Sequence, residues 1–117
     1  MTDRDPDCLF CRIVADEIPS DRVYEDDDVI AFRDIHPQAP THVLVIPRRH
    51  VADIDTLEDD DAGLLSALFA VVRHVAGQEG LAKGYRVVTN VGAESGQSVF
   101  HLHFHLLGGR AMSWPPG

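Results

Sequence analysis

Hydrophobic and polar residues alternate with two different periods along this chain, and the periods predict its helices and strands. Apolar residues recur at helical spacing in one central stretch: Leu64, Leu65, Leu68, Phe69, Val72, Val75 and Ala76. This pattern predicts a long helix that begins at Thr56, a fair N-cap, and ends near Gly80. A shorter helix is predicted over residues 8–16, where Leu9 and Ile13 are four residues apart and share one face.

Five stretches have the composition of β-strands: residues 21–25, 29–34, 42–47, 85–90 and 101–107. The stretch at 42–47 is apolar on both faces, which predicts a central strand. Two prolines within residues 35–40 exclude a regular helix there and predict a loop. The order of the elements predicts an α+β domain, a five-stranded antiparallel meander with one long and one short helix.

Three histidines, His101, His103 and His105, alternate with apolar residues in the last of these stretches. Side chains two residues apart share a face of a strand, so the imidazoles are predicted to line one face and the apolar residues the other. Imidazole titrates near neutral pH and can act as nucleophile, proton carrier or metal ligand. The alternation alone leaves two interpretations open, a metal site made of the three histidines and a nucleophilic site for phosphoryl chemistry.

Cys8 and Cys11 form a Cys-x-x-Cys pair and are the two cysteines of the chain. In a cytosolic protein such a pair is typical of a metal or redox site. A thioredoxin-type site needs a strand-to-helix junction in a βαβ unit, which the pattern lacks. A structural zinc needs two further ligands, usually histidines. Two partly buried free thiols are the other interpretation.

Length and charge narrow the classes of partner. With 117 residues the chain is predicted to be one domain, residues 1–117, with a flexible N-terminus at residues 1–7. A net charge of −9 argues against a nucleic-acid partner, while a small phosphate ester is compatible with it. No apolar run approaches the roughly 20 residues of a membrane span, and the acidic N-terminus is unlike a signal peptide. We therefore expect a cytoplasmic protein without a membrane partner.

Four segments together resemble one known family. Residues 101–107 (HLHFHLL) match the His-φ-His-φ-His-φ-φ signature of the histidine triad (HIT) proteins, which bind nucleotides. Residues 34–47 resemble the nucleoside-binding segment of that family, and residues 96–98 resemble its phosphate-contacting turn. The last four residues, Trp-Pro-Pro-Gly, resemble the ending of the Hint branch, the histidine triad nucleotide-binding proteins. The resemblance spans roughly residues 8 to 117.

The resemblance implies a role for each matching residue. His103 is expected to be the nucleophile, His105 and His42 to stabilise charge on the phosphate, and Ser98 to relay a proton. His101 belongs to the catalytic set of the signature as well. The expected nucleotide-binding residues, besides His103 and His105, are Leu9, Ile13, Phe32, Asp34, Ile35, Asn90, Gly96, Gln97 and Ser98. Asp34 is expected to bind the ribose hydroxyls.

The resemblance also implies a metal site and an assembly. His50 and His101 are expected to complete a structural zinc site with Cys8 and Cys11, in which case His101 is not free for catalysis. No cofactor is expected to be required for catalysis. The expected assembly is a homodimer whose sheets join into a ten-stranded sheet, with the tail at residues 108–117 near the dimer interface.

The function that this resemblance implies is hydrolysis of purine nucleoside 5′-phosphoramidates with release of AMP, through a nucleotidyl-histidine intermediate. Three alternatives stay open. A dinucleoside polyphosphate hydrolase would use the same nucleophile with another leaving group. A nucleotide-binding regulatory module would bind without turnover, and a metal-binding module would use the three histidines as ligands. Sequence leaves open whether adenine or guanine is preferred.

Overall fold

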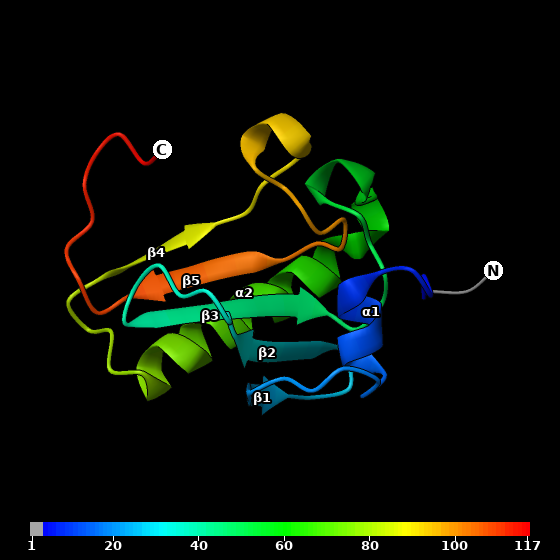
Figure 1. Cartoon of the computed structure of the whole chain (residues 1–117), viewed down its shortest axis with the longest axis horizontal. Helices are drawn as coiled ribbons and strands as arrows, with labels where there is room; N and C mark the ends of the chain where they lie inside the picture. The colour runs from blue at the N-terminus through cyan, green and yellow to red at the C-terminus, as the bar shows by residue number, and fades with distance from the viewer. Residues whose placement is uncertain (1–3) are drawn as a thin grey trace.

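The computed structural model describes residues 4–117, in which one antiparallel sheet lies between a long and a short helix (Figure 1). In chain order the elements are α1 (Leu9–Val14), β1 (Arg22–Glu25), β2 (Val29–Arg33), β3 (Thr41–Pro47), α2 (Ala62–Gln78), β4 (Tyr85–Val88) and β5 (Phe104–Gly108). The predicted α+β fold is confirmed. The predicted flexible N-terminus falls in part on residues 1–3, which lie outside the described residues.

The strand order is β1-β2-β3-β5-β4, so the prediction of a simple meander is wrong. After β3 the chain crosses behind the sheet through α2 and forms β4 at the far edge, and β5 then returns between β3 and β4 (Figure 1). β5 pairs with both neighbours: Leu106 lies opposite Val43 of β3 and opposite Val87 of β4. Within β5, Phe104 and Leu106 are buried on one face, while His105 and Leu107 are half-buried on the other.

Alternation along the strands sends two apolar sets to opposite faces of the sheet. One set packs with α2 in a buried cluster: Val29 and Ala31 of β2, Val43 and Val45 of β3, and Phe104 and Leu106 of β5. The other set packs with α1: Ile30 and Phe32 of β2, and Leu44 and Ile46 of β3. Because both faces are covered, residues 29–32 of β2 and 43–47 of β3 are apolar, and the predicted central strand at 42–47 is confirmed.

α2 begins at Ala62, six residues later than predicted from the Thr56 N-cap. Thr56 instead closes a 3-10 turn: its backbone N–H donates to Asp53 Oδ1 at 3.0 Å, and Asp53 N–H donates back to Thr56 Oγ1 at 3.3 Å. A second turn follows, in which Glu58 N–H donates to Asp61 Oδ2 at 2.9 Å. These reciprocal bonds satisfy the backbone in short turns and delay the helix. Within residues 4–117, no helix is long and apolar enough to cross a membrane.

The last strand was predicted for residues 101–107, but β5 begins only at Phe104. The first two histidines of the triad, His101 and His103, therefore lie before the strand. The backbone of this segment bonds outside the sheet. Leu102 N–H donates to Val51 O at 2.6 Å, and the Thr89 hydroxyl donates to His103 O at 2.8 Å. Thr89 thus lies just beyond β4, which ends at Val88 rather than at residue 90.

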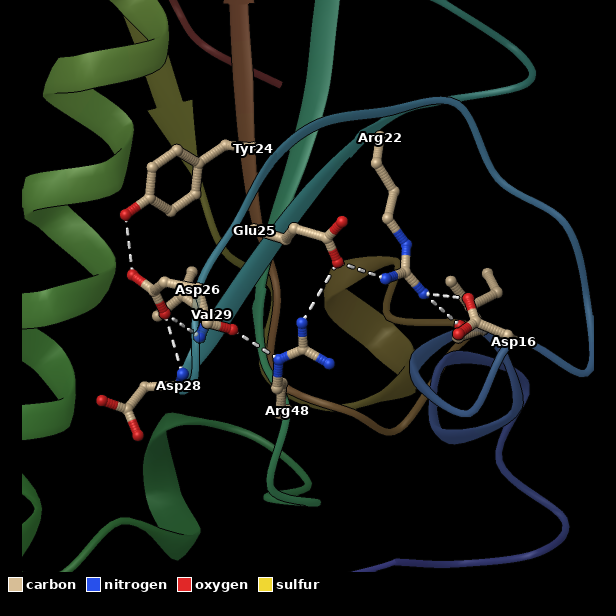
Figure 2. A network of polar contacts seen from close by, with 9 residues as sticks. Asp16, Arg22, Tyr24, Glu25, Asp26, Asp28, Val29 and Arg48 are labelled. Carbon is tan, nitrogen blue, oxygen red and sulfur yellow. Dashed lines mark hydrogen bonds and ion pairs between the residues drawn. The ribbon is translucent and has the colours of Figure 1, made fainter.

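The turn between β1 and β2 is held by its own acidic residues (Figure 2). Asp26 Oδ1 accepts the backbone N–H groups of Asp28 and Val29, both at 2.8 Å, and its Oδ2 accepts the Tyr24 hydroxyl at 2.7 Å. Arg48 donates to Asp26 O at 2.6 Å and so ties the turn to the end of β3. The acidic run at residues 25–28 therefore forms a solvated turn.

Candidate active site and metal cluster

The histidines of the triad lie on the α1 side of the sheet, and the apolar residues between them lie on the α2 side. Leu102, Phe104 and Leu106 belong to the core cluster with α2 and are at most 3% exposed. His103 is 7% exposed and packs edge-on against Phe10 of α1, with ring centroids 5.1 Å apart. The predicted alternation is confirmed, although only part of the segment is a regular strand.

His103 has one ring nitrogen committed and one available. Its Nδ1 lies 2.7 Å from the carbonyl oxygen of His101, and because a carbonyl only accepts, Nδ1 carries the proton. Nε2 then carries a lone pair, and the residue lines the pocket described below. Burial lowers the pKa of His103, which keeps the imidazole neutral and nucleophilic at neutral pH.

A hydrogen-bond chain determines the tautomers of His42 and His105. The Gln38 backbone N–H donates to His42 Nδ1 at 3.0 Å, so Nδ1 is the unprotonated nitrogen of His42. His42 Nε2–H then donates to His105 Nδ1 at 2.9 Å, and His105 keeps its proton on Nε2. Burial, with His103 and His42 nearby, lowers the pKa of His105 to about 4, so this chain is neutral at neutral pH.

A cavity of about 600 Å³ opens beside these histidines, a volume suited to a ligand of nucleotide size. Eight of the predicted site residues line it: Leu9, Ile13, Phe32, Asp34, Ile35, Ser98, His103 and His105. They come from α1, from β2 and the loop after it, from the turn before the triad, and from the triad itself. The structure thus brings together residues that the sequence separates by up to 96 positions, from Leu9 to His105.

Five residues predicted for the catalytic or nucleotide-binding set do not line this cavity: His42, Asn90, Gly96, Gln97 and His101. His42 contacts two residues that do line it: its Nε2 lies 2.9 Å from His105 Nδ1 and 3.5 Å from Asp34 Oδ2. The Gln97 amide donates to Ala52 O at 2.9 Å and to Val99 O at 3.1 Å, and its Oε1 accepts Gly92 N–H at 2.8 Å. Both hydrogens of the amide are therefore used, and the side chain holds the loop instead of offering a donor to a phosphate, contrary to the prediction for Gln97.

Other residues that line the cavity were not predicted to bind the nucleotide, among them Phe10, Ile18, Leu44 and Val99. Phe10 packs edge-on against Phe32 of β2, with centroids 5.4 Å apart. A signal existed for Leu44, because the period of two in β3 places it on the same face as His42. Ile18 and Val99 lie outside regular elements and gave no comparable signal.

Cys8, Cys11, His50 and His101 converge under α1, with their ligand atoms all within 4.8 Å of one another. His50 Nδ1 lies 3.3 Å from Cys11 Sγ, and His101 Nδ1 lies 3.5 Å from Cys8 Sγ. His101 Nε2 donates to Pro47 O at 2.7 Å, so its Nδ1 carries the lone pair that faces the sulfurs.

This cluster fits a zinc ion. It offers two thiol and two imidazole ligands, the Cys2His2 set of structural sites, and His101 has the carbonyl partner that orients a ligating ring. Backbone N–H groups also point at the sulfurs: Cys11 N–H donates to Cys8 Sγ, and Asp5 N–H donates to Cys11 Sγ, both at 3.4 Å. Burial raises the pKa of the Cys11 thiol to about 11, opposite to a redox-active thiol, whose pKa is lowered.

The three triad histidines do not form one metal site. His101 turns its available nitrogen to the cysteines, while His103 turns its own to the cavity. Among residues 4–117, a second convergent group is made of Asp34, His42 and His105. Its two histidines are already bonded to each other at 2.9 Å, which accounts for their proximity without an ion.

An α+β scaffold with a ligand pocket beside a row of buried histidines defines a class of proteins, and three comparisons place the chain within it. The HIT domain model matches residues 15–112. A 14 kDa zinc-binding protein of Zea mays is 51% identical over 115 residues, which cover 97% of this chain and 90% of that protein. A HIT-like protein of Synechococcus elongatus is 51% identical over 111 residues, which cover 95% and 97%.

A solved structure of a HIT family hydrolase from Legionella pneumophila superposes with a TM-score of 0.93 at 53% identity. The match covers 95% of this chain and 100% of that chain. Sequence and structure agree over almost the whole length in each case. The chain belongs to the HIT domain family.

Proposed function

We propose that the protein hydrolyses purine nucleoside 5′-phosphoramidates and releases the nucleoside monophosphate. The observation that carries the proposal is the bond from His103 Nδ1–H to His101 O at 2.7 Å, because it leaves Nε2 with a lone pair beside a nucleotide-sized cavity. A hydrolase is in line with the name of the Legionella pneumophila relative, a HIT family hydrolase. The phosphoramidate substrate follows from the resemblance of the C-terminal residues to the Hint branch.

The reaction takes place in two displacements. In the first, His103 Nε2 attacks the α-phosphorus, a bond from phosphorus to Nε2 forms, and the bond from phosphorus to the amine nitrogen breaks. The Ser98 hydroxyl, on the wall of the same cavity, relays a proton from solvent to the departing amine. In the second, water attacks the same phosphorus, the bond from phosphorus to Nε2 breaks, and the proton that the water loses returns to solvent, which restores neutral His103. Covalent catalysis divides one difficult displacement into two easier ones.

Charge on the phosphate is stabilised by donors that are oriented before the substrate binds. The chain from Gln38 through His42 leaves His105 with its proton on Nε2. Because His105 lines the cavity, this N–H can donate to a nonbridging oxygen. The resemblance assigns His42 the same task. His42 reaches the phosphate through His105 in this geometry, so we place it as the residue that orients that donor.

The nucleoside occupies the apolar part of the cavity. Leu9, Ile13 and Phe32 supply apolar surface for a purine base, and Ile35 is 86% exposed at the rim. Asp34 already accepts the His36 backbone N–H through Oδ1 at 2.8 Å, which fixes the carboxylate at the edge of the cavity. We assign its remaining acceptor capacity to the two ribose hydroxyls.

The test is turnover of adenosine 5′-phosphoramidate in parallel with diadenosine polyphosphates and with AMP binding. The proposal predicts release of AMP from the phosphoramidate with a higher kcat/KM than from any dinucleotide. Preferential cleavage of a dinucleotide would contradict the proposal and show that the leaving group is a nucleotide and not an amine. AMP binding without turnover of either substrate would instead identify a regulatory module.

We also propose that Cys8, Cys11, His50 and His101 hold a structural zinc ion. The Zea mays relative is named a zinc-binding protein, and the four residues fit that ion as described above. Zinc would join the start of α1 to the segment that carries the triad and contribute to folding stability. No step of the proposed reaction passes through it. Metal analysis of the purified protein should find about one zinc per chain.

We further propose a homodimer in the cytoplasm. β4 is the last strand of the sheet, so its outer edge is open to pairing with a second copy, and the tail beyond β5 carries Trp114, which is 82% exposed. Two free cysteines suit a reducing compartment. Light scattering should give twice the mass of the chain, and a monomer at micromolar concentration would contradict the assembly.

A further inference from the structure

The tail leaves β5 beside the loop that leads into β3, because Gly108 at the end of β5 pairs with Thr41 at the start of β3 (Figure 1). Gly109 has φ +89°, and a Cβ placed there would lie 2.9 Å from Pro40 Cβ. A Cβ on Gly108 would lie 2.7 Å from Leu81 Cδ1. A side chain at position 109 would therefore push the tail away from the loop, and one at position 108 would meet the side chain of Leu81, which follows α2. The contact brings the next residue, Arg110, over residue 38.

Arg110 hydrogen-bonds to the backbone of Gln38. Its Nε and Nη2 both donate to Gln38 O, at 3.1 and 3.0 Å, and its Nη1 donates to Ala111 O at 3.1 Å. The guanidinium is planar and rigid, so three bonds from it fix the position of residue 38 relative to the tail. Gln38 is itself an exposed loop residue between Pro37 and Pro40. Without the arginine, a surface loop of this kind is expected to move.

The backbone of Gln38 also begins the hydrogen-bond chain to the catalytic pocket. Its N–H donates to His42 Nδ1, and His42 Nε2–H donates to His105 Nδ1. If the first bond is lost, no donor faces Nδ1 any longer, and only the Asp34 carboxylate, with Oδ2 3.5 Å from His42 Nε2, still favours a proton on Nε2. With the proton on Nδ1, His42 turns a lone pair toward His105, whose own proton must then move to Nδ1 to face it. His105 Nε2 would lose the hydrogen that it offers to the cavity.

We propose that Arg110 is a positioning residue for catalysis, which acts through the Gln38 backbone to maintain the protonated Nε2 of His105. The inference rests on the proposed function, in which that N–H stabilises the phosphate. It assigns a catalytic consequence to a tail residue that lies outside the nucleotide cavity. Because the donor would be misdirected for part of the time rather than removed, the loss should be smaller than the roughly 10²–10³-fold of deleting an oxyanion donor.

The alternative is that Arg110 only fastens the tail, and Arg86 provides a matched control for it. Arg86 and Arg110 line the same cavity of about 790 Å³ on the tail side of the molecule. Arg86 Nη2 donates to Ser113 O at 2.8 Å, so it also fastens the tail, but its bond does not reach residue 38. Replacing either arginine by alanine removes one positive charge from the same cavity.

The experiment compares wild type, Arg110→Ala, Arg110→Lys and Arg86→Ala by two readouts. The first is the ¹⁵N NMR signature of the histidine ring nitrogens at pH 7.5, which distinguishes protonated from unprotonated nitrogens in His42 and His105. The second is kcat and KM for adenosine 5′-phosphoramidate. We expect Arg110→Ala to mix the tautomers of His42 and His105 and to lower kcat about tenfold with KM nearly unchanged. Arg110→Lys should recover part of both, and Arg86→Ala should change neither.

Each outcome separates the inference from the proposed function. Unchanged ring-nitrogen signals of His42 and His105 in Arg110→Ala would overturn the inference, whatever the rates. Equal effects in Arg110→Ala and Arg86→Ala would overturn it as well, because fastening of the tail would then explain both. Altered tautomers in Arg110→Ala, in a protein whose wild type does not turn over the phosphoramidate, would support the relay and overturn the proposed function alone.

Discussion

His101 and His103 are two residues apart on the same face, and they differ in which ring nitrogen is used to hold the ring. His101 donates through Nε2 to Pro47 O and turns Nδ1 to two thiols. His103 donates through Nδ1 to His101 O and turns Nε2 to the cavity. The carbonyl partner of each ring therefore leaves one imidazole with its free nitrogen toward the thiols and the other with its free nitrogen toward the cavity, which suits the metal-ligand role proposed for His101 and the nucleophile role proposed for His103.

The neighbours of the His101 and His103 rings differ as well. Burial lowers the pKa of both, that of His101 to about 4, so both are neutral and have a lone pair to offer at neutral pH. α1 supplies the second partner in each case: its N-cap Cys8 lies against His101, and Phe10 packs on His103. One six-residue helix thus contacts two histidines of the triad, for which we propose separate chemistry.

The largest expected effect is the loss of turnover when the proposed nucleophile is removed, and it distinguishes the cavity from the metal cluster. His103→Ala should lower kcat for adenosine 5′-phosphoramidate by roughly 10⁴–10⁶-fold, the scale seen when a nucleophile is deleted, and should leave zinc content unchanged. His101→Ala should instead lower the zinc content, with a smaller loss of kcat than in His103→Ala. Steady-state kinetics and metal analysis on the same preparations measure both. Turnover by His103→Ala within tenfold of wild type would remove this residue from the role of nucleophile.

The metal cluster should respond to Cys11→Ser with a loss of zinc affinity that exceeds the roughly 10–100-fold typical of changes at residues behind the ligands. The melting temperature should fall, because zinc binding contributes to folding free energy. Competition with a coloured chelator and thermal unfolding check this prediction. Chelator-treated wild type is the control, and it should match the variant in stability. Equal zinc affinity in wild type and variant would argue for free thiols at this place.

A smaller effect should separate nucleoside binding from chemistry. Asp34→Asn should raise KM about ten- to hundredfold, the range of a hydrogen bond to a charged group, with kcat little changed. Wild type should prefer the ribonucleoside substrate over its 2′-deoxy analogue, and the variant should lose most of that preference. Asp27→Asn, in the turn between β1 and β2, is the matched control. An unchanged preference in Asp34→Asn would place the ribose elsewhere.

The smallest effect concerns stability and pH. The folded-state pKa of His105 is lowered to about 4, below its unfolded value of about 6.5. The unfolded chain therefore binds more protons between these values, so the stability from the neutral ring is fully present above pH 6.5 and is lost as pH falls toward 4. Urea unfolding at pH 7.5 and 5.0 should show a smaller decrease in His105→Gln than in wild type. Equal decreases would mean that His105 is not held neutral.

Much of the fold could be predicted because its signals are local. A period of two assigns faces to the triad segment without knowledge of its neighbours, and the apolar run at residues 42–47 indicates a strand that is covered on both faces. Strand order is not local, and the insertion of β5 between β3 and β4 depends on pairing across more than 50 residues of chain, as between Leu44 and His105. The start of α2 was missed because the acidic residues before it form capping boxes of their own.

The residues of the site also fall into those that a local sequence motif predicts and those that depend on contacts distant in sequence. Residues that match family motifs, such as Asp34 and Ser98, are placed on the wall of the cavity. Gln97 also matches a motif, yet its amide bonds to Ala52 O, 45 residues away, which no local pattern indicates. Arg110 carried no signal at all, because its partner Gln38 is 72 residues away and contacts it only through a backbone carbonyl. The sequence does not reveal hydrogen bonds from side chains to backbone groups that are distant along the chain.

The most direct test of the account is detection of the covalent intermediate. Wild type in excess over adenosine 5′-phosphoramidate would be quenched at successive times in alkaline denaturant, in which a phosphorus–nitrogen bond to histidine survives, and then fragmented in a mass spectrometer. The account predicts one adenylyl group per chain, located on His103, in protein that keeps its zinc. A nucleotide on His101 or His105, or no protein-bound nucleotide at any time up to full turnover, would contradict it.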